Sequence, residues 1–447
     1  MTILFTPVGT TDPVRGYHDG AMLHILRHYP VDKVIVFLTE EMGEHEKNEG
    51  WYSKGIQSVK KECPVEWIYS GIKNPQQFNE LTVLQEAFGQ VYSREAKDTE
   101  WLLNISSGTP QMKTVMSLLA IDYDRTKAIQ VNSPEGKSNV GIEPNKEQDM
   151  LYMLVDYNED TNRDAPNRCI EPKLRLLRKY GIRLQIASLV ENYEYGGALD
   201  ILRQNKELFP GDTERLLRHA VDRENLQWKE ANKVIASYQG KQLIPSANEF
   251  TEYFRVMILK QLKGQLPDFI IKLSPILLEL GKKYMKNLEP QFKIQDCGYL
   301  RGGDRALVIT RRNMEAYNPK LLSYMDNQFP YTGFRDAPLS MDIITYVCEY
   351  LKLNDKKQDT NHAKLTDLFT RLRLIEQLGR NPIAHTITNL TEEKLKHLKT
   401  KEGKEVGMNS KELLSRLQEA ICIVTGRKIT LDYDRLNGYI LDSMKEN

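Results

Sequence analysis

The 447-residue sequence lacks the features that would reveal a function at first sight. It has no excess of basic residues, because 62 lysines and arginines stand against 61 aspartates and glutamates and leave a formal net charge of +1. Any surface that binds nucleic acid must therefore be local. No apolar run reaches the about 20 residues of a membrane-spanning helix, and Met1–Pro7 lacks the length and the basic residues of a signal peptide. We therefore expect no membrane partner.

Cysteines are few. The five cysteines are scattered and odd in number, and they form neither a Cys-x2-Cys metal motif nor a disulfide framework. His24 and His28 are four residues apart on a predicted helix, but no cluster of carboxylates or cysteines joins them in the sequence. These observations predict a reduced, cytoplasmic protein without a metal site or a bound cofactor.

The glycine motifs of nucleotide-binding enzymes are also missing. No Gly-x-Gly-x-x-Gly follows the first predicted strand, and no suitable Gly-x4-Gly-Lys-Ser/Thr occurs elsewhere. This absence argues against a nucleotide-dependent oxidoreductase, and an absorbance scan for a bound cofactor would test that alternative.

The N-terminal third of the chain alternates short apolar runs with stretches of helical spacing. Nearly continuous β-branched runs such as Lys33–Thr39 are typical of strands that are buried on both faces. The alternation predicts an α/β, Rossmann-like parallel sheet, with residues 150–157 adding further strand structure at its end. The five main strands are predicted at residues 2–8, 33–39, 65–72, 100–106 and 127–133.

Two polar loops follow the first and fourth strands, Gly9–Gly16 and Ser106–Lys113. In the common 3-2-1-4-5 order these strands are neighbours at the reversal point, where such sheets bind ligands. Thr109 is a natural N-cap, with Pro110 as the first helical residue. Such residues also punctuate ordinary turns, but two loops at one reversal point favour a site for a phosphate or another polar ligand. The candidate ligand-binding residues are Thr10, Thr11, Asp12, Arg15, Ser106, Ser107, Gly108, Thr109 and Gln111.

The rest of the chain shows mainly helical spacing. Residues 157–167 are polar and aperiodic, which predicts a linker, and residues 298–304 predict a turn or loop. The lysine-rich segment 392–404 is expected to be a solvated face or a loop, with phosphate contact as the alternative. We expect three domains: a Rossmann-like domain at 1–165, a helical linker domain at 166–243 and an all-α domain at 244–447.

A helix boundary is predicted close to the end of the chain. Apolar residues at helical spacing predict a helix over about 363–378, which would stop at Gly379. Asn381 is then interpreted as an N-cap and Pro382 as the first residue of the following helix.

Such a boundary would bring Arg380 and His385 together at a helix start, where backbone N–H groups favour an anion. A guanidinium could stabilise charge on a phosphodiester, and an imidazole could move a proton. The plainer alternative is an ion pair between Arg380 and Glu376, one turn earlier.

Two motifs carry a resemblance. The stretch Arg380-Asn-Pro-Ile-Ala-His385 resembles the R-x4–6-H motif of HEPN ribonucleases. A first strand ending in Gly-Thr-Thr-Asp and a later strand running into Ser-Ser-Gly-Thr-Pro-Gln-Met resemble a CARF domain. CARF, then helices, then a C-terminal HEPN motif is the layout of the ancillary CARF–HEPN ribonucleases of type III CRISPR systems (Csm family). The resemblance covers both ends of the chain and matches their order.

This resemblance implies a homodimeric, metal-independent endoribonuclease that cleaves single-stranded RNA and is activated by a cyclic oligoadenylate. The 2′-hydroxyl of the RNA would attack the adjacent phosphorus, with His385 moving a proton, Arg380 binding the phosphorane and Asn381 orienting the motif. We expect cyclic hexa-adenylate as the activator, bound by the CARF loops, and slow cleavage of this ring by the CARF domain. No stable DNA partner is expected.

A nucleotide-sensing transcriptional regulator is the alternative of a different class. It would bind DNA through its helical region, although no turn signature demands a helix-turn-helix reader. Degradation of RNA by the purified protein in the presence of a chelator would discriminate between the two.

Overall fold

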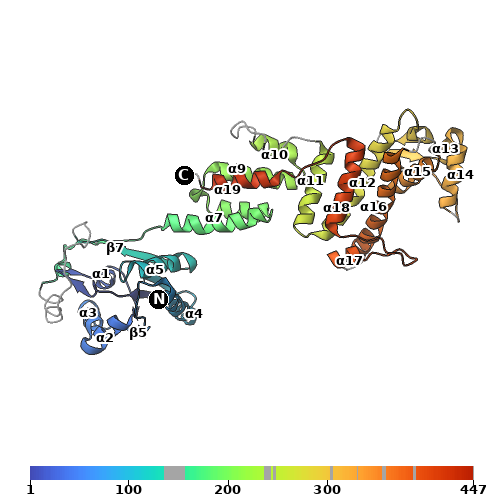
Figure 1. The fold of residues 1–447 in the computed structure, drawn as a ribbon. Coiled ribbons are helices and arrows are strands. Elements are labelled where there is room, and N and C mark those ends of the chain that lie inside the picture. Colours follow the sequence, from blue (N-terminus) through green and yellow to red (C-terminus); the bar gives the residue numbers. More distant parts are fainter. Residues whose placement is uncertain are drawn as a thin grey trace. The chain divides into compact units, whose positions relative to one another are not determined.

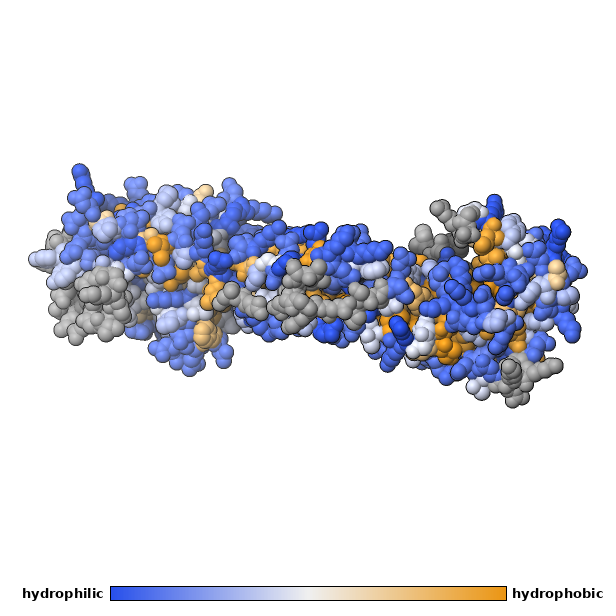
Figure 2. Space-filling model, turned by 90° about the horizontal axis from the view of Figure 1, so that it is seen from above, coloured by the Kyte–Doolittle hydropathy of each residue, from blue (hydrophilic) through white to orange (hydrophobic). Residues whose placement is uncertain are grey.

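The computed structural model describes residues 1–134, 157–235, 243–244, 248–302, 306–329, 331–354, 359–385 and 389–445, without the side chains of 235 and 381–385. The chain forms two compact units, Met1–Gly181 and Ile182–Asn447 (Figure 1). None of the described helices combines the length and the apolar character needed to cross a membrane. In Figure 2 hydrophilic residues cover most of the face in view.

The first unit contains a six-stranded sheet in the order β5-β4-β1-β6-β7-β8. Its first five strands are parallel, and β8 pairs antiparallel with β7. The sheet therefore has the common 3-2-1-4-5 order, and the predicted Rossmann-like α/β class is confirmed. The strands are β1 (Thr2–Pro7), β4 (Lys33–Leu38), β5 (Val65–Tyr69), β6 (Glu100–Asn104), β7 (Thr126–Val131) and β8 (Cys169–Ile170).

The sheet lies between two layers of helices (Figure 1). Apolar residues on alternate sides of the central strands pack against these layers. One face, including Leu4 and Val36, packs on α1 (Ala21–His28), α2 (Glu40–Glu49) and α3 (Trp51–Val59). The other face, including Phe5 and Phe37, packs on α4 (Thr82–Arg94) and α5 (Pro110–Asp122). Burial on both faces explains why these strands are nearly continuous apolar runs.

The predicted linker at 157–167 is wrong for residues 158–160, whereas most of residues 161–167 are exposed. Asn158 and Asp160 are buried, and the Asp160 carboxylate accepts a hydrogen bond of 2.7 Å from the Asp19 backbone N–H. The segment then leads into β8, which continues the sheet. The polar composition of the segment resembled that of a linker. Its buried side chains are instead hydrogen-bonded to partners far away in the sequence, which the composition does not show. Residues 150–156, where further strand structure was expected, lie outside the described residues.

Helices in the middle of the chain share a core with its last helix. They are α7 (Arg175–Glu191), α8 (Tyr195–Gln204) and α9 (Gly211–Glu224), with α10 (Trp228–Ile235) after them in the sequence, and the last helix is α19 (Tyr433–Ser443). Asn437 of α19 accepts a 2.8 Å hydrogen bond from the Tyr195 hydroxyl and donates one of 3.0 Å to the Val190 carbonyl. The end of the chain therefore closes the core of the middle helices.

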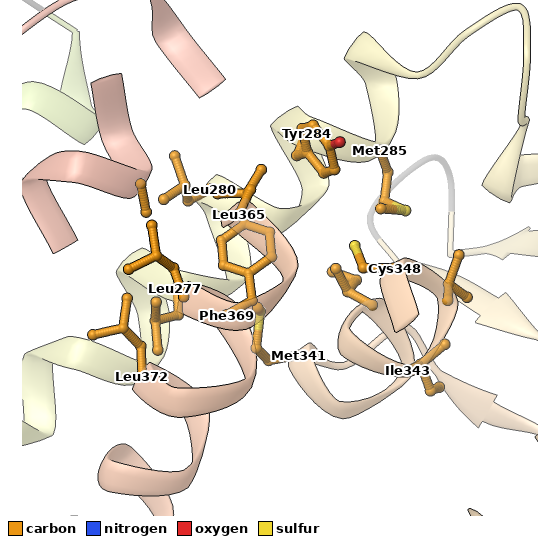
Figure 3. Packing of buried hydrophobic residues seen from close by; sticks show 14 of the residues in the cluster. Leu277, Leu280, Tyr284, Met285, Met341, Ile343, Cys348, Leu365, Phe369 and Leu372 are labelled. Carbon is orange, nitrogen blue, oxygen red and sulfur yellow. The ribbon is translucent and has the colours of Figure 1, made fainter. Parts of the chain in front are cut away.

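A helical bundle forms the rest of this unit. Its main helices are α11 (Glu249–Leu262), α12 (Leu266–Asn287), α15 (Met341–Leu353), α16 (Thr360–His385) and α18 (Ser410–Thr425). Leu365, Phe369 and Leu372 of α16 pack between residues of α12 and α15 (Figure 3). The long α16 helix is thus held on two sides.

Shorter elements complete the bundle. The helices α13 (Arg311–Tyr317), α14 (Pro319–Gln328) and α17 (Glu392–Lys396) lie between the main helices in sequence. A small antiparallel sheet contains β9 (Gly298–Arg301), β10 (Ala306–Ile309) and β11 (Ala337–Pro338). The loop predicted at 298–304 is therefore wrong for residues 298–301, which pair with β10.

Candidate functional site

The helix boundary predicted at Gly379 does not exist. The α16 helix runs without interruption from Thr360 to His385, through Gly379 and Pro382. Gly379 is buried, and a Cβ atom at this position would lie 3.3 Å from Cγ2 of Ile270 on α12. The glycine therefore allows α16 and α12 to approach closely, and tertiary packing overrides its weak helix propensity. Asn381 consequently lies inside a helix and is not an N-cap.

Arg380 lies on this continuous helix and is partly exposed, with 45% of its side chain accessible. Its Nη1 atom lies 3.5 Å from Oε1 of Glu376 and donates a 3.4 Å hydrogen bond to the Ser274 hydroxyl of α12. The predicted alternative, a pair with Glu376, is thus present in the structure. The pair is long, and the exposed part of the guanidinium remains open to a further anion.

A charge network that sequence reasoning missed lies behind Arg380. The second oxygen of Glu376 accepts a hydrogen bond from Arg373, and the Glu376 side chain is only 1% exposed. Arg373 also donates to both oxygens of Asp342, at 2.9 and 3.0 Å. These carboxylates keep the pKa of Arg373 above its usual value although its burial acts against this. The sequence could have indicated this network, since the charged residues at positions 373, 376 and 380 share one helix face.

The other two motif residues are placed only through their backbone. Asn381 and His385 belong to the last turns of α16. Their side chains lie outside the described residues, so the roles of Asn381 and His385 stay predictions.

The two polar loops of the first unit do meet. Strands β1 and β6 are hydrogen-bonded neighbours, as predicted. A Cβ atom on Gly9 would lie 3.1 Å from both N and Cα of Gly108, which has a φ of +82°. Two backbones approach this closely only where no side chain intervenes. The two glycines therefore fix the contact between the loops.

Asn104, at the end of β6, organises the second loop. Its amide nitrogen donates to the hydroxyls of Thr6 at 2.9 Å and Ser107 at 2.8 Å, and its oxygen accepts from the Ser106 N–H at 2.9 Å. Asn104 is fully buried. Asn104 was not selected from the sequence. Its position could have indicated it, because Asn104 is a polar residue at the end of the otherwise apolar run Trp-Leu-Leu.

Asp12 faces inward. It is 2% exposed, and its oxygens accept hydrogen bonds from the N–H groups of Gly9 at 3.2 Å and Met22 at 3.1 Å. Burial raises the pKa of the Asp12 carboxyl, and hydrogen bonds from Ser107, Met22 and Gly9 act in the opposite direction. Asp12 therefore ties the first loop to the start of α1, and its predicted contact with a ligand stays a prediction.

The predicted helix cap at Thr109 is confirmed. Its hydroxyl oxygen accepts from the Met112 N–H at 3.3 Å, and Pro110 is the first residue of α5. The same hydroxyl donates to the Pro75 carbonyl at 2.7 Å. The Thr109 hydroxyl is therefore engaged in holding the loop. Ser106 is engaged similarly, since its hydroxyl accepts from the Val131 N–H at 2.7 Å.

The remaining candidates surround the two loops. Thr10 is exposed, Thr11 and Gln111 are partly exposed, and Arg15 lies on β2 (Val14–Arg15), which pairs with β3 (His18–Asp19). Lys113 was not predicted as a site residue, but the Asp12 charge acts on its ammonium, and burial lowers the pKa of Lys113. A cation beside two loops rich in donors suits an anionic ligand.

His24 has carboxylate neighbours that the sequence did not indicate. Asp19 and Asp160 each place an oxygen 3.8 Å from its Nδ1 atom. Arg27 already pairs with Asp19 at 2.8 Å and Arg168 with Asp160 at 2.6 Å, while the backbone N–H of Arg168 donates to Nε2 of His24. These guanidinium groups neutralise the carboxylates, so the cluster is an internal charge network and fits no cation.

Comparison with known proteins identifies three consecutive domains. The Cas_Csm6 CARF domain model matches residues 64–169, and the CRISPR-associated protein Csm6 6H domain model matches residues 172–224. The Cas_Csm6 HEPN domain model matches residues 238–441, which include the motif from Arg380 to His385.

Similar proteins and a similar structure agree with these matches. The CRISPR system endoribonuclease Csm6 of Enterococcus italicus is 27% identical over 399 residues, covering 87% of this chain and 89% of that protein. The one of Mycobacterium tuberculosis is 28% identical over 450 residues and 98% of both chains.

The solved structure of Enterococcus italicus Csm6 bound to cyclic hexa-2′-fluoro-hexa-dAMP has the same fold. It matches with a TM-score of 0.59 at 22% identity and covers 99% of this chain and 100% of that chain. Three domain models of one family match consecutive segments of the chain, in the order that the fold shows. The chain therefore belongs to the Csm6 family of CARF–HEPN ribonucleases.

Proposed function

We propose that this protein is an endoribonuclease that is activated by a cyclic oligoadenylate and cleaves single-stranded RNA at the motif from Arg380 to His385. One observation carries the proposal: the motif lies on a helix inside the segment that matches the HEPN model. The relatives named above are endoribonucleases, and the similar structure holds a cyclic hexanucleotide analogue.

The proposed reaction needs no metal ion. The 2′-hydroxyl oxygen of the RNA attacks the adjacent phosphorus, the bond from phosphorus to the 5′-oxygen breaks, and the products are a 2′,3′-cyclic phosphate and a 5′-hydroxyl. His385 moves the proton, Arg380 stabilises the charge on the phosphoryl oxygens, and Asn381 orients the motif.

The surroundings of Arg380 support this role. Glu376 and Ser274 hold one side of the guanidinium, while almost half of the side chain remains accessible. A guanidinium that is anchored on one side loses little conformational freedom when it binds a phosphate on the other.

We propose a homodimer as the active form. One motif supplies one imidazole and one guanidinium, and a two-fold axis would combine the motifs of two subunits in one site. Such symmetry also suits a cyclic, repetitive activator. A cytoplasmic location is part of the same proposal.

The activator is proposed to bind between the loops that Gly9 and Gly108 hold together. Partly or fully exposed residues such as Thr10 and Thr11 and the cation of Lys113 would contact its phosphates and riboses, while Asp12, Ser107 and Thr109 shape the loops. We propose cyclic hexa-adenylate as the ring.

The test is RNA cleavage by the purified protein with cyclic tetra- or hexa-adenylate, each in excess EDTA. We expect cleavage only with the hexa-adenylate ring, and fragments that end in a cyclic phosphate. Cleavage that requires magnesium or leaves 3′-hydroxyl ends would contradict the mechanism. The absence of RNA degradation with either ring would contradict the proposed ribonuclease function.

Turnover of the activator is tested separately. We propose that the CARF domain slowly opens the ring without metal. A ribose 2′-hydroxyl oxygen attacks the adjacent phosphorus, the bond from phosphorus to the 5′-oxygen breaks, and the 5′-oxygen leaves as a hydroxyl with the proton. In the His385→Ala protein we expect slow loss of the ring, and less loss when Thr109→Ala loosens the loop. A ring recovered intact after long incubation would remove this part of the proposal and leave the sensor role standing.

A further inference from the structure

A groove of about 890 Å³ lies in the second unit, between α10, α11 and α12. Three aromatic side chains line it: Trp228 at the start of α10, and Phe250 and Tyr253 on α11. All three are partly exposed. Phe250 and Tyr253 pack partly against the core of the bundle, and the exposed part of each of the three rings offers a flat apolar face to the groove.

Ammonium groups accompany these rings. Nζ of Lys229 lies 5.5 Å from the ring centre of Trp228, and Nζ of Lys272 lies 4.9 Å from that of Tyr253. Lysine side chains thus run alongside the aromatic faces, within the range of cation–π attraction.

The charge of the groove is positive. Four lysines line it against two glutamates, and one of these glutamates, Glu279, pairs with Lys282 at 2.7 Å. Lys283 and Lys286 are exposed and form no ion pair with any residue that the structure describes. At least two cations on one wall therefore remain available for an anionic partner.

Stacking faces combined with unpaired lysines are the chemistry that binds single-stranded nucleic acid. Bases stack on aromatic rings without regard to sequence, and lysines follow the phosphates. A purely apolar peptide would leave the ammonium groups without partners.

The helix α12 connects this groove to the cleavage motif. Pro275 lines the groove, and the neighbouring Ser274 accepts the hydrogen bond from Arg380. Lys286 follows eleven positions after Pro275, or about 16 Å along the helix axis. An RNA strand that leaves the motif would meet the lysines of α12 and, across the groove, the aromatic rings of α10 and α11.

We propose that this groove binds the single-stranded flank of the RNA substrate outside the cleaved bond. The proposal rests on the ribonuclease function proposed above and adds a binding surface to it. It predicts that affinity for long RNA depends on the groove, whereas the bond-breaking step does not.

The test compares two double variants with equal changes in net charge. Lys283→Gln/Lys286→Gln alters the groove. Lys320→Gln/Lys411→Gln is the matched control, since both of these lysines are exposed and form no ion pair with a described residue. Binding of a labelled oligouridylate is measured in a His385→Ala background, which prevents cleavage.

We expect the groove variant to bind about tenfold more weakly than the control, with the slope of log affinity against log salt reduced by about 1.4. RNA should also quench the fluorescence of Trp228. Phe250→Ala should weaken RNA binding, and its melting temperature should show that the protein is still folded under the conditions of the binding measurement. In the cleaving protein, KM for long RNA should rise while kcat stays the same.

Two results would overturn the proposal. Equal affinity and equal salt slope in the groove and control variants would show that RNA does not use the groove. Dissociation of a dimer in the groove variant with unchanged RNA binding would assign this surface to a second copy of the chain. Because binding is measured without cleavage, failure here is distinguishable from a protein that binds RNA but never cuts it.

Discussion

Arg380 is held by Glu376 from one turn earlier on the same helix. Nη1 of Arg380 and Oε1 of Glu376 lie 3.5 Å apart, with 45% of the arginine and only 1% of the glutamate side chain exposed. The carboxylate is buried and fixed by Arg373, whereas the guanidinium reaches the surface. This geometry allows a structural ion pair and a phosphate site to coexist, and it leads to the first two predictions.

The first prediction concerns the motif. Arg380→Ala and His385→Ala should each lower RNA cleavage by at least ~100-fold, because each removes a group that acts in the transition state. Both proteins should keep the fold, measured by circular dichroism and melting temperature. Arg312→Ala, which removes an exposed arginine from α13, is the control and should cleave RNA normally. Two motif variants that still cut RNA would place the active site elsewhere.

The second prediction concerns Glu376 as a positioning residue. Glu376→Gln keeps the shape but removes the charge that Arg373 and Arg380 share, so we expect kcat to fall by roughly tenfold. Stability should fall by ~1–3 kcal/mol, because a buried partner of two cations is lost. Steady-state kinetics and urea unfolding measure the two effects. A fall in stability with unchanged kcat would limit Glu376 to a structural role.

The third prediction concerns the helix contact at Gly379. Gly379→Leu should destabilise the protein by ~1–3 kcal/mol, because its side chain would press on Ile270 of α12 and move the motif helix. Gly438→Ala is the matched control within α19, where a Cβ atom meets nothing within 4 Å. This control should raise stability by up to ~1 kcal/mol, as expected for a helix interior. Equal effects of both changes on the melting temperature would contradict the close contact.

The fourth prediction uses pH. Burial opposes ionisation of Asp160, but its hydrogen bond to His24 and the charge of Arg168 hold the pKa of this carboxyl well below its usual value of 3.8. A lowered folded-state pKa gives stability that is present above about pH 4 and is lost as the pH falls through the folded-state pKa. Asp160→Asn should therefore cost ~3 kcal/mol at neutral pH, and the difference should shrink only in acid.

Urea unfolding between pH 3 and pH 8 measures this difference. The neighbouring Glu159→Gln is the control, since 62% of the Glu159 side chain is exposed and its loss should cost little at any pH. A difference that is the same at every pH would contradict the charge network.

The fifth prediction concerns the activator loop. Thr109→Ala removes both the cap on the Met112 N–H and the bond to the Pro75 carbonyl, so more activator should be needed for half-maximal RNA cleavage. Thr109→Ser keeps the hydroxyl and should restore the activator dependence. Cleavage at saturating activator should be unchanged in both variants, because the motif lies in the other unit. A loss of maximal cleavage with unchanged activator dependence would contradict the assignment.

The sequence by itself determined the parallel sheet, whereas the order of its strands came from the structure. Buried parallel strands are apolar over their whole length, and runs such as Lys33–Leu38 are therefore visible without the structure. The neighbouring positions of β1 and β6 were expected only from the order that is common in such sheets, and the structure shows them paired. The cap at Thr109 was predictable because it depends on residues within one helical turn.

Only the tertiary structure decided the surroundings of the sites. Gly379 and Pro382 indicated a helix end by local propensity, but packing against Ile270 keeps α16 continuous. Asp12 ties its own loop to the start of α1 through two backbone hydrogen bonds that the sequence did not indicate. Asp19 and Asp160 meet across 141 positions of the chain. Local sequence determines propensity and polarity, whereas the partner of a buried polar group depends on which distant segments fold against it.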